Sequence, residues 1–241
     1  MDNSVRLVKR LADAIGCSRS EAEQYISGGW VTVDGMPIEE PGARVEPSQA
    51  VNLLPNASLE SVAPITLLMH KPVTLLAAIA QEPDRQLITE ATRAPDDRCG
   101  TKFLKRHARD LTLTNPLEDR ASGLIVLTQD WRIVRKLITE SSRVEQEFVV
   151  DVTGSLVADG LQHLQQDMRW NGRPISAIKV SWQSEHRLRF AIKGAERGMI
   201  DYLCEQVGLQ ATAIKRIRIG RISMGALPVA TWRYLDGYER F

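Results

Sequence analysis

Cationic side chains gather in the first twenty residues, where helices are expected. Arg6, Lys9 and Arg10 fall within one stretch of helical periodicity, and Arg19 stands at the start of a second. The unpaired backbone N–H groups at the start of a helix, together with an adjacent arginine, bind phosphate groups well. The spacing therefore predicts a surface that contacts the backbone of a nucleic acid.

The alternative is that these cations form an ordinary solvated helix face. Acidic residues in the same region favour it, namely Asp13, Glu21, Glu23, Glu39, Glu40 and Glu46. The formal net charge of the whole chain is only +1. Because no global basic field exists, binding to a nucleic acid would depend on local patches.

Two short helices are predicted to position these cations. Apolar residues at helical spacing predict a helix over residues 5–15, which Gly16 ends. Ser18, followed three residues later by Glu21, is typical of a capping box at the start of the second helix. That helix is expected to end at Gly28-Gly29.

A small hairpin is predicted next. Val31 and Val33 alternate with polar residues, and Asp34-Gly35 is a strong turn signal. We expect this first domain to cover residues 1–54, followed by a polar, turn-rich linker over 55–63 and a second domain over 64–241.

The second domain mixes strands and helices without a regular alternation. We predict α+β architecture with a largely antiparallel sheet. A helix is expected after Asp130, which would cap it, and another over residues 198–209. Residues 81–100 are polar and without periodicity, which predicts a surface excursion.

Composition excludes several classes of protein. The three cysteines are far apart and form no CxxC pair, and the four histidines lack metal-ligand spacing, so no metal site is expected. No apolar run approaches the ~20 residues that span a bilayer, and no signal peptide is evident. We therefore expect a cytoplasmic protein with no membrane partner.

The first domain resembles the small S4-type RNA-binding domain of ribosomal proteins. The resemblance lies in RLVKRLADAIGCSRSEAEQYISGGWVTVDG, which matches the basic first helix, the S-R-x-E-A helix and the G-x-V-x-V-[ND]-G hairpin of that domain. Such domains grip structured RNA by its shape and backbone. The resemblance implies that RNA contacts Arg6, Lys9, Arg10, Ser18, Arg19, Ser20 and Gln24.

The second domain resembles the bacterial ribosomal-RNA pseudouridine synthases of the RsuA/RluB/RluE/RluF type. Four segments carry the resemblance over residues 64–236: LLMHKPV, PLEDRASGLIVLTQD, VEQEFVVDV and IKRIRIGRISMGALPVATWRYL. An S4-type domain ahead of such a domain is the usual arrangement in that family. The family is mainly monomeric, so we expect a monomer.

The resemblance implies that the chain converts a uridine in structured ribosomal RNA to pseudouridine. The family uses no metal and no small-molecule cofactor. The target base leaves its stack, and a carboxylate attacks either the sugar C1′ or the base C6. The glycosidic bond breaks, the base rotates, and a carbon–carbon bond forms. This chemistry needs an ionised carboxylate, a cation beside it, and an aromatic ring against the base.

Carried over residue by residue, the catalytic roles fall on altered side chains. The family's aspartate corresponds to Glu118, with Asp119 as the alternative, and its stacking tyrosine corresponds to Phe148. The arginine that would pair with the carboxylate is replaced by Asp201, which would repel it.

Two other arginines could supply the missing charge of that pair, Arg216 or Arg197. Lys71 of the first motif and Arg120 of the second are expected to contact RNA. These replacements leave a second hypothesis open, a member that has lost catalysis and acts as an RNA-binding, ribosome-assembly or regulatory factor. A third is a protein-interaction module on a reused fold.

Overall fold

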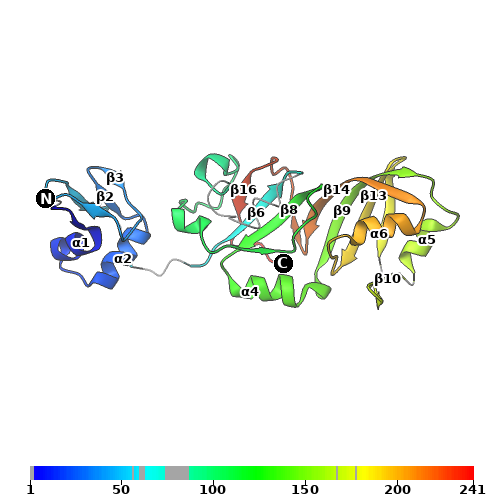
Figure 1. The fold of residues 1–241 in the computed structure, drawn as a ribbon, viewed down its shortest axis with the longest axis horizontal. Helices are drawn as coiled ribbons and strands as arrows, with labels where there is room; N and C mark the ends of the chain where they lie inside the picture. Colours follow the sequence, from blue (N-terminus) through cyan, green and yellow to red (C-terminus); the bar gives the residue numbers. More distant parts are fainter. Residues whose placement is uncertain (1–2, 56, 60–62, 74–86, 167, 177) are drawn as a thin grey trace. The chain divides into compact units, whose positions relative to one another are not determined.

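The computed structural model describes the chain except for residues 1–2, 56, 60–62, 74–86, 167 and 177, and it divides into two compact units (Figure 1). Unit 1 comprises residues 1–63 and 102–109, and unit 2 comprises residues 64–101 and 110–241. Within the described residues, no helix has the length and apolar character needed to cross a membrane.

Unit 1 is the predicted arrangement of two helices and a hairpin. Its core consists of apolar side chains from both helices and the small sheet, including Leu7, Leu11, Ile26 and Val31. Its elements are β1 (Val5–Arg6), α1 (Leu7–Ile15), α2 (Arg19–Ser27), β2 (Val31–Val33), β3 (Met36–Pro37), β4 (Arg44–Val45) and β5 (Val51–Leu53). The three-stranded sheet has the order β3-β2-β5, and β1 pairs with β4.

The capping box and the first helix of unit 1 can each be compared with their predictions. The capping box is confirmed, since Ser18 Oγ accepts from Glu21 N at 3.2 Å and Glu21 Oε2 accepts from Ser18 N at 2.8 Å. The helix prediction was wrong at its start, because Val5 and Arg6 are extended and pair with Val45 and Arg44. Arg6 therefore lies on a strand beside α1.

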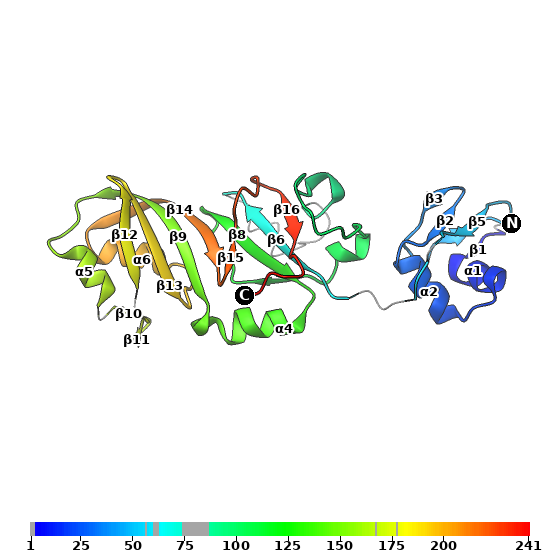
Figure 2. The same ribbon diagram turned by 180° about the vertical axis from the view of Figure 1, so that it is seen from behind.

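Unit 2 is built on a nine-stranded sheet, seen from two sides in Figures 1 and 2. The main path runs β12-β13-β9-β14-β8-β6-β16, with β15 beside β14 and β7 beside β8. Every pairing is antiparallel except that of β14 with β8. The strands are β6 (Thr66–Lys71), β7 (Thr112–Thr114), β8 (Ala121–Thr128), β9 (Glu145–Gly154), β12 (Lys179–Ser184), β13 (Arg187–Lys193), β14 (Leu209–Ile219), β15 (Ile222–Ser223) and β16 (Trp232–Tyr234). The predicted fold class is confirmed.

Strand patterning explains this order. β8 is apolar and buried almost throughout, as expected of a central strand covered on both faces. β9 alternates, with Gln146, Phe148 and Val150 buried, while Glu145 and Glu147 on the other face both pair with Arg218 of β14, at 2.6 and 2.7 Å.

Short helices flank the sheet. Asp130 caps α4 (Trp131–Val134) as predicted, because its side chain accepts from Arg132 N. A π-helix over Arg135–Thr139 continues it. α5 (Gly160–Gln165) and α6 (Met199–Gln206) lie at the β12–β13 end of the sheet (Figure 1).

The predicted surface excursion over residues 81–100 is attached to the sheet in the part described, 87–100. Ile88 and Ala94 are buried, and Ala94 N donates to Trp232 O of β16 at 2.7 Å. These two apolar residues are isolated within a polar stretch, so no sequence periodicity indicated that they anchor it. Residues 81–86 lie outside the described part of the chain.

Gly123 on β8 allows the parallel pairing with β14. It has φ +112°, and a Cβ there would overlap the backbone of Arg216, its register partner.

We expect Gly123→Ala to lower the free energy of unfolding by at least about 3 kcal/mol, since the backbone strain and the steric clash add. Gly225→Ala is the control, because Gly225 also has a positive φ but has nothing within 4 Å of a new Cβ; its cost should be about 1–2 kcal/mol. Urea unfolding of both variants tests this, and equal losses would contradict the close-approach argument.

Candidate active site and RNA-binding groove

The segment that carries Glu118 and Asp119 is a loop, residues 115–120, between β7 and β8. Asn115 has φ +46°, which turns the chain at the start of the loop. Two buried cations hold the loop from beneath. They are Lys71, at the end of β6, and Arg216, on β14, and both are essentially inaccessible.

Each buried cation binds backbone carbonyls. Lys71 Nζ donates to Ala121 O at 2.6 Å, Pro72 O at 3.0 Å and Asp119 O at 3.2 Å. Arg216 donates to Asn115 O at 2.7 Å, Leu124 O at 2.8 Å and Gln146 Oε1 at 2.9 Å. These bonds compensate for the loss of hydration at both cationic groups.

Both cations also respond to the loop carboxylates. Burial lowers the pKa of Lys71, whereas the nearby Asp119 and Glu118 raise it. Burial likewise lowers the pKa of Arg216, and Glu118 raises it. Glu118 therefore lies in the field of two fixed positive charges.

The outer side of the loop is attached to the N-terminal end of α6. Glu118 Oε1 accepts a hydrogen bond from Gly198 N, the residue that precedes α6. The positive end of a helix dipole favours an anion at this place. Asp119 Oδ1 lies 3.6 Å from Arg197 Nη2, and both side chains are more than half exposed.

Arg120 and Asp201 form the third contact between loop and helix. Arg120 Nη2 is paired with Asp201 Oδ1, and Arg120 Nη1 donates to Ala211 O at 3.0 Å. Asp201, which was expected to repel a loop carboxylate, is paired with a cation of the loop itself. This ion pair has its cation on the loop and its carboxylate on α6, the reverse of the pair that the resemblance implies.

Two predicted site residues occupy positions that differ from those their roles require. Lys71 is buried and bound to carbonyls, whereas contact with RNA needs an accessible amine. Phe148 is only 4% exposed and lies opposite Arg216 and Phe190 in the sheet, whereas stacking needs an accessible ring. Alternation along β9 places Phe148 on the buried face, whereas every residue of β6, Lys71 included, is buried. Motif matching alone does not reveal either placement.

Unit 1 contains a groove of about 480 Å³ that collects the predicted cations. Arg6, Lys9 and Arg19 line it, with Arg44 as a fourth cation and Glu23 as the one carboxylate among its lining residues. Arg44 was not predicted; its Nε donates to Ser4 Oγ at 2.8 Å and its Nη2 to Ser4 O at 2.6 Å.

The other predicted RNA-binding residues of unit 1 lie outside this groove. Arg10 Nη2 donates to Pro47 O at 3.2 Å, and Ser18 is occupied in the capping box. Ser20 and Gln24 are exposed on α2 and do not line the groove.

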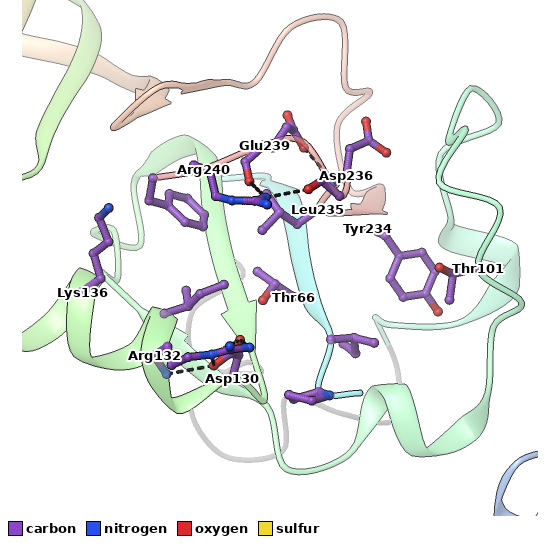
Figure 3. Close-up of a pocket in the computed structure, with 15 residues that line it drawn as sticks. Thr66, Thr101, Asp130, Arg132, Lys136, Tyr234, Leu235, Asp236, Glu239 and Arg240 are labelled. Atoms are coloured by element: carbon purple, nitrogen blue, oxygen red, sulfur yellow. Dashed lines mark hydrogen bonds and ion pairs between the residues drawn. The ribbon is translucent and has the colours of Figure 1, made fainter. Parts of the chain in front are cut away.

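A larger cavity of about 510 Å³ lies elsewhere in unit 2, between α4 and the chain after β16 (Figure 3). Its charges are largely compensated: Asp130 pairs with Arg132 at 2.7 Å, and Glu239 pairs with Arg233 at 2.7 Å. The Arg132 guanidinium holds the pKa of Asp130 below its usual range. None of the described residues predicted for catalysis or RNA binding lines this cavity. Within the described part of the chain, no cluster of three or more His, Cys, Asp or Glu side chains could hold a metal ion.

Comparisons with known proteins find similarity over both units. The S4 domain model matches residues 5–51. The chain is 24% identical over 242 residues to "Dual-specificity RNA pseudouridine synthase RluF" of Escherichia coli, covering 99% of this chain and 78% of that protein. It is 22% identical over 240 residues to "Ribosomal large subunit pseudouridine synthase B" of Bacillus subtilis, covering 97% and 93%.

The chain is a homologue of the S4-domain pseudouridine synthases. A solved structure titled "Crystal structure of pseudouridylate synthase" has the same fold, with a TM-score of 0.57, 16% identity, and coverage of 97% of this chain and 96% of that one.

The reversed ion pair can be tested by swapping its charges. The single variants Arg120→Asp and Asp201→Arg place like charges together, and each should cost about 0.5–1 kcal/mol of unfolding free energy, because the side chains are 49% and 23% exposed. The double variant should recover most of this loss. A double-mutant cycle in urea measures the coupling, and strictly additive losses would show that the pair contributes nothing.

Proposed function

We propose that this chain binds structured ribosomal RNA through unit 1 and isomerises a uridine of that RNA to pseudouridine in unit 2, with Glu118 as the reacting carboxylate. The observation that carries the proposal is the environment of Glu118. Its carboxylate lies at the N-terminal end of α6 and accepts a hydrogen bond from Gly198 N. It also interacts electrostatically with the buried cations Lys71 and Arg216. A carboxylate fixed in one place beside cations can act as a nucleophile.

The proposed roles of the two units, RNA binding in unit 1 and catalysis in unit 2, follow from where their charges lie. The groove of unit 1 carries four cations against one carboxylate, so it can hold RNA phosphates although the chain as a whole has a net charge of only +1. Glu118 would attack the uridine at C1′ or C6 once the base has left its stack. The proposal includes a monomer acting without a cofactor.

A non-catalytic RNA-binding factor is the second candidate, and two observations favour it. The resemblance implies an arginine at the position of Asp201. Asp201 is instead a carboxylate, and it forms an ion pair with Arg120. Phe148 is buried. Mapping pseudouridines in ribosomal RNA after deletion of the gene separates the two candidates: the loss of one modification supports the synthase, and an unchanged map supports the binding factor.

Substitution of the two loop carboxylates tests the assignment of the nucleophile. We expect Glu118→Gln to lower the rate of pseudouridine formation by on the order of a thousandfold or more, since the nucleophile itself is removed. Asp119→Asn, the matched control one residue away, should retain activity within about tenfold, because the Asp119 carboxylate is exposed and its ion pair with Arg197 is a surface pair. Assays on a ribosomal RNA transcript measure both rates. The opposite ranking would assign the role to Asp119.

Neutralising the groove of unit 1 tests RNA binding independently of catalysis. The variant Arg6→Gln/Lys9→Gln/Arg19→Gln should weaken binding to a ribosomal RNA transcript and lower the slope of log K against log salt by about 2 to 3, since each phosphate contact contributes about 0.7–0.9. A control variant with Arg135, Arg143 and Arg221 of unit 2 changed to Gln removes the same charge. Equal effects of the two variants would contradict a localised site.

A further inference from the structure

A hairpin beside α6 has no part in the site described so far. It consists of β10 (Arg169–Trp170) and β11 (Arg173–Pro174), which pair antiparallel. The turn residues Asn171 and Gly172 have φ +48° and +76°, as two-residue hairpin turns require. Its short, tight turn presents Trp170 in a defined orientation.

The Trp170 ring is fixed from two sides. Its centroid lies 5.3 Å from that of Tyr202 on α6 in an edge-to-face arrangement, and its Nε1 donates to Glu196 Oε2 at 2.9 Å. Aromatic pairs of this geometry stabilise one another beyond their area of contact. Trp170 is nevertheless only partly buried, so part of the ring remains accessible.

A cavity of about 360 Å³ opens beside this ring. Arg173 and Lys193 contribute two exposed cations to its lining, and Glu196, already bonded to Trp170, contributes the one carboxylate. Asn171 adds an amide that can both donate and accept. An aromatic face next to cations is the combination that proteins use to hold a nucleotide, with the base stacked and the phosphate paired.

The cavity lies close to Gly198, the residue that contacts Glu118. Gly198 donates its N–H to Glu118. A Cβ on the same Gly198 would lie 3.4 Å from the Trp170 ring, so the ring lies next to this residue. Met199, the next residue, lines the cavity. One residue of backbone thus separates the Trp170 ring from the candidate nucleophile.

We propose that this cavity holds the RNA nucleotide adjacent to the target uridine, its base stacked on Trp170 and its phosphate paired with Arg173 and Lys193. This inference rests on the proposed function, since the uridine is placed at Glu118. It assigns the hairpin the role of fixing the strand that flanks the reacting base.

Binding to a ribosomal RNA transcript tests the proposal without requiring isomerisation. Trp170→Leu should weaken binding by about tenfold, whereas Trp170→Phe, which keeps an aromatic face, should stay within about threefold of the parent. Arg173→Gln/Lys193→Gln should lower the salt slope by about 1. Arg221→Gln, an exposed arginine on the β14–β15 turn, is the control and should bind as the parent does. Unchanged affinity and slope in all the hairpin variants would overturn the proposal.

Photocrosslinking locates the contact directly. With a transcript containing 4-thiouridine, irradiation of the full chain should give a crosslinked peptide that includes Trp170, and Arg221→Gln should give the same peptide. Crosslinks confined to other peptides would overturn the proposal, as would uridine monophosphate competing for this peptide as well as the transcript does. Failure of the proposed function has a different signature, namely the Trp170 crosslink without any pseudouridine formed.

Discussion

The burial of Lys71 and Arg216 beneath loop 115–120 is the constraint on which the rest of unit 2 depends. Removing two cations from water is costly, and it is tolerated only because both bind carbonyls of the loop and its flanking strands at 2.6–3.2 Å. The cations therefore fix the loop backbone, and the loop in turn sets the position of Glu118. The parallel contact of β14 with β8, made possible at Gly123, brings Arg216 under the loop.

Loop 115–120 is joined to the N-terminal end of α6 mainly by charged side chains. Three contacts join them, from Glu118 to Gly198 N, from Asp119 to Arg197 and from Arg120 to Asp201. Asp201 alone would repel the loop carboxylates, but Arg120 neutralises it. The Glu118 carboxylate lies beside two buried cations and at the N-terminal end of α6.

Charge in this protein is organised locally. The net charge of the chain is only +1, yet a groove in unit 1 contains four cations and a cavity at the β10–β11 hairpin contains two. Each of these two sites contains one carboxylate, and other acidic residues form ion pairs such as those of Glu145 and Glu147 with Arg218. Surfaces for an anionic polymer can thus coexist with a nearly neutral chain.

The sequence by itself determined the local elements. The capping box at Ser18, the cap at Asp130 and the mixed, largely antiparallel fold all follow from short-range patterns, and the family motifs located loop 115–120. Only the tertiary structure decided that Arg6 pairs with β4, that Lys71 and Phe148 face inward, and that Trp170 lies behind Gly198. These depend on strand pairings between residues far apart in the chain, which set which face a side chain occupies and which local periodicity does not encode.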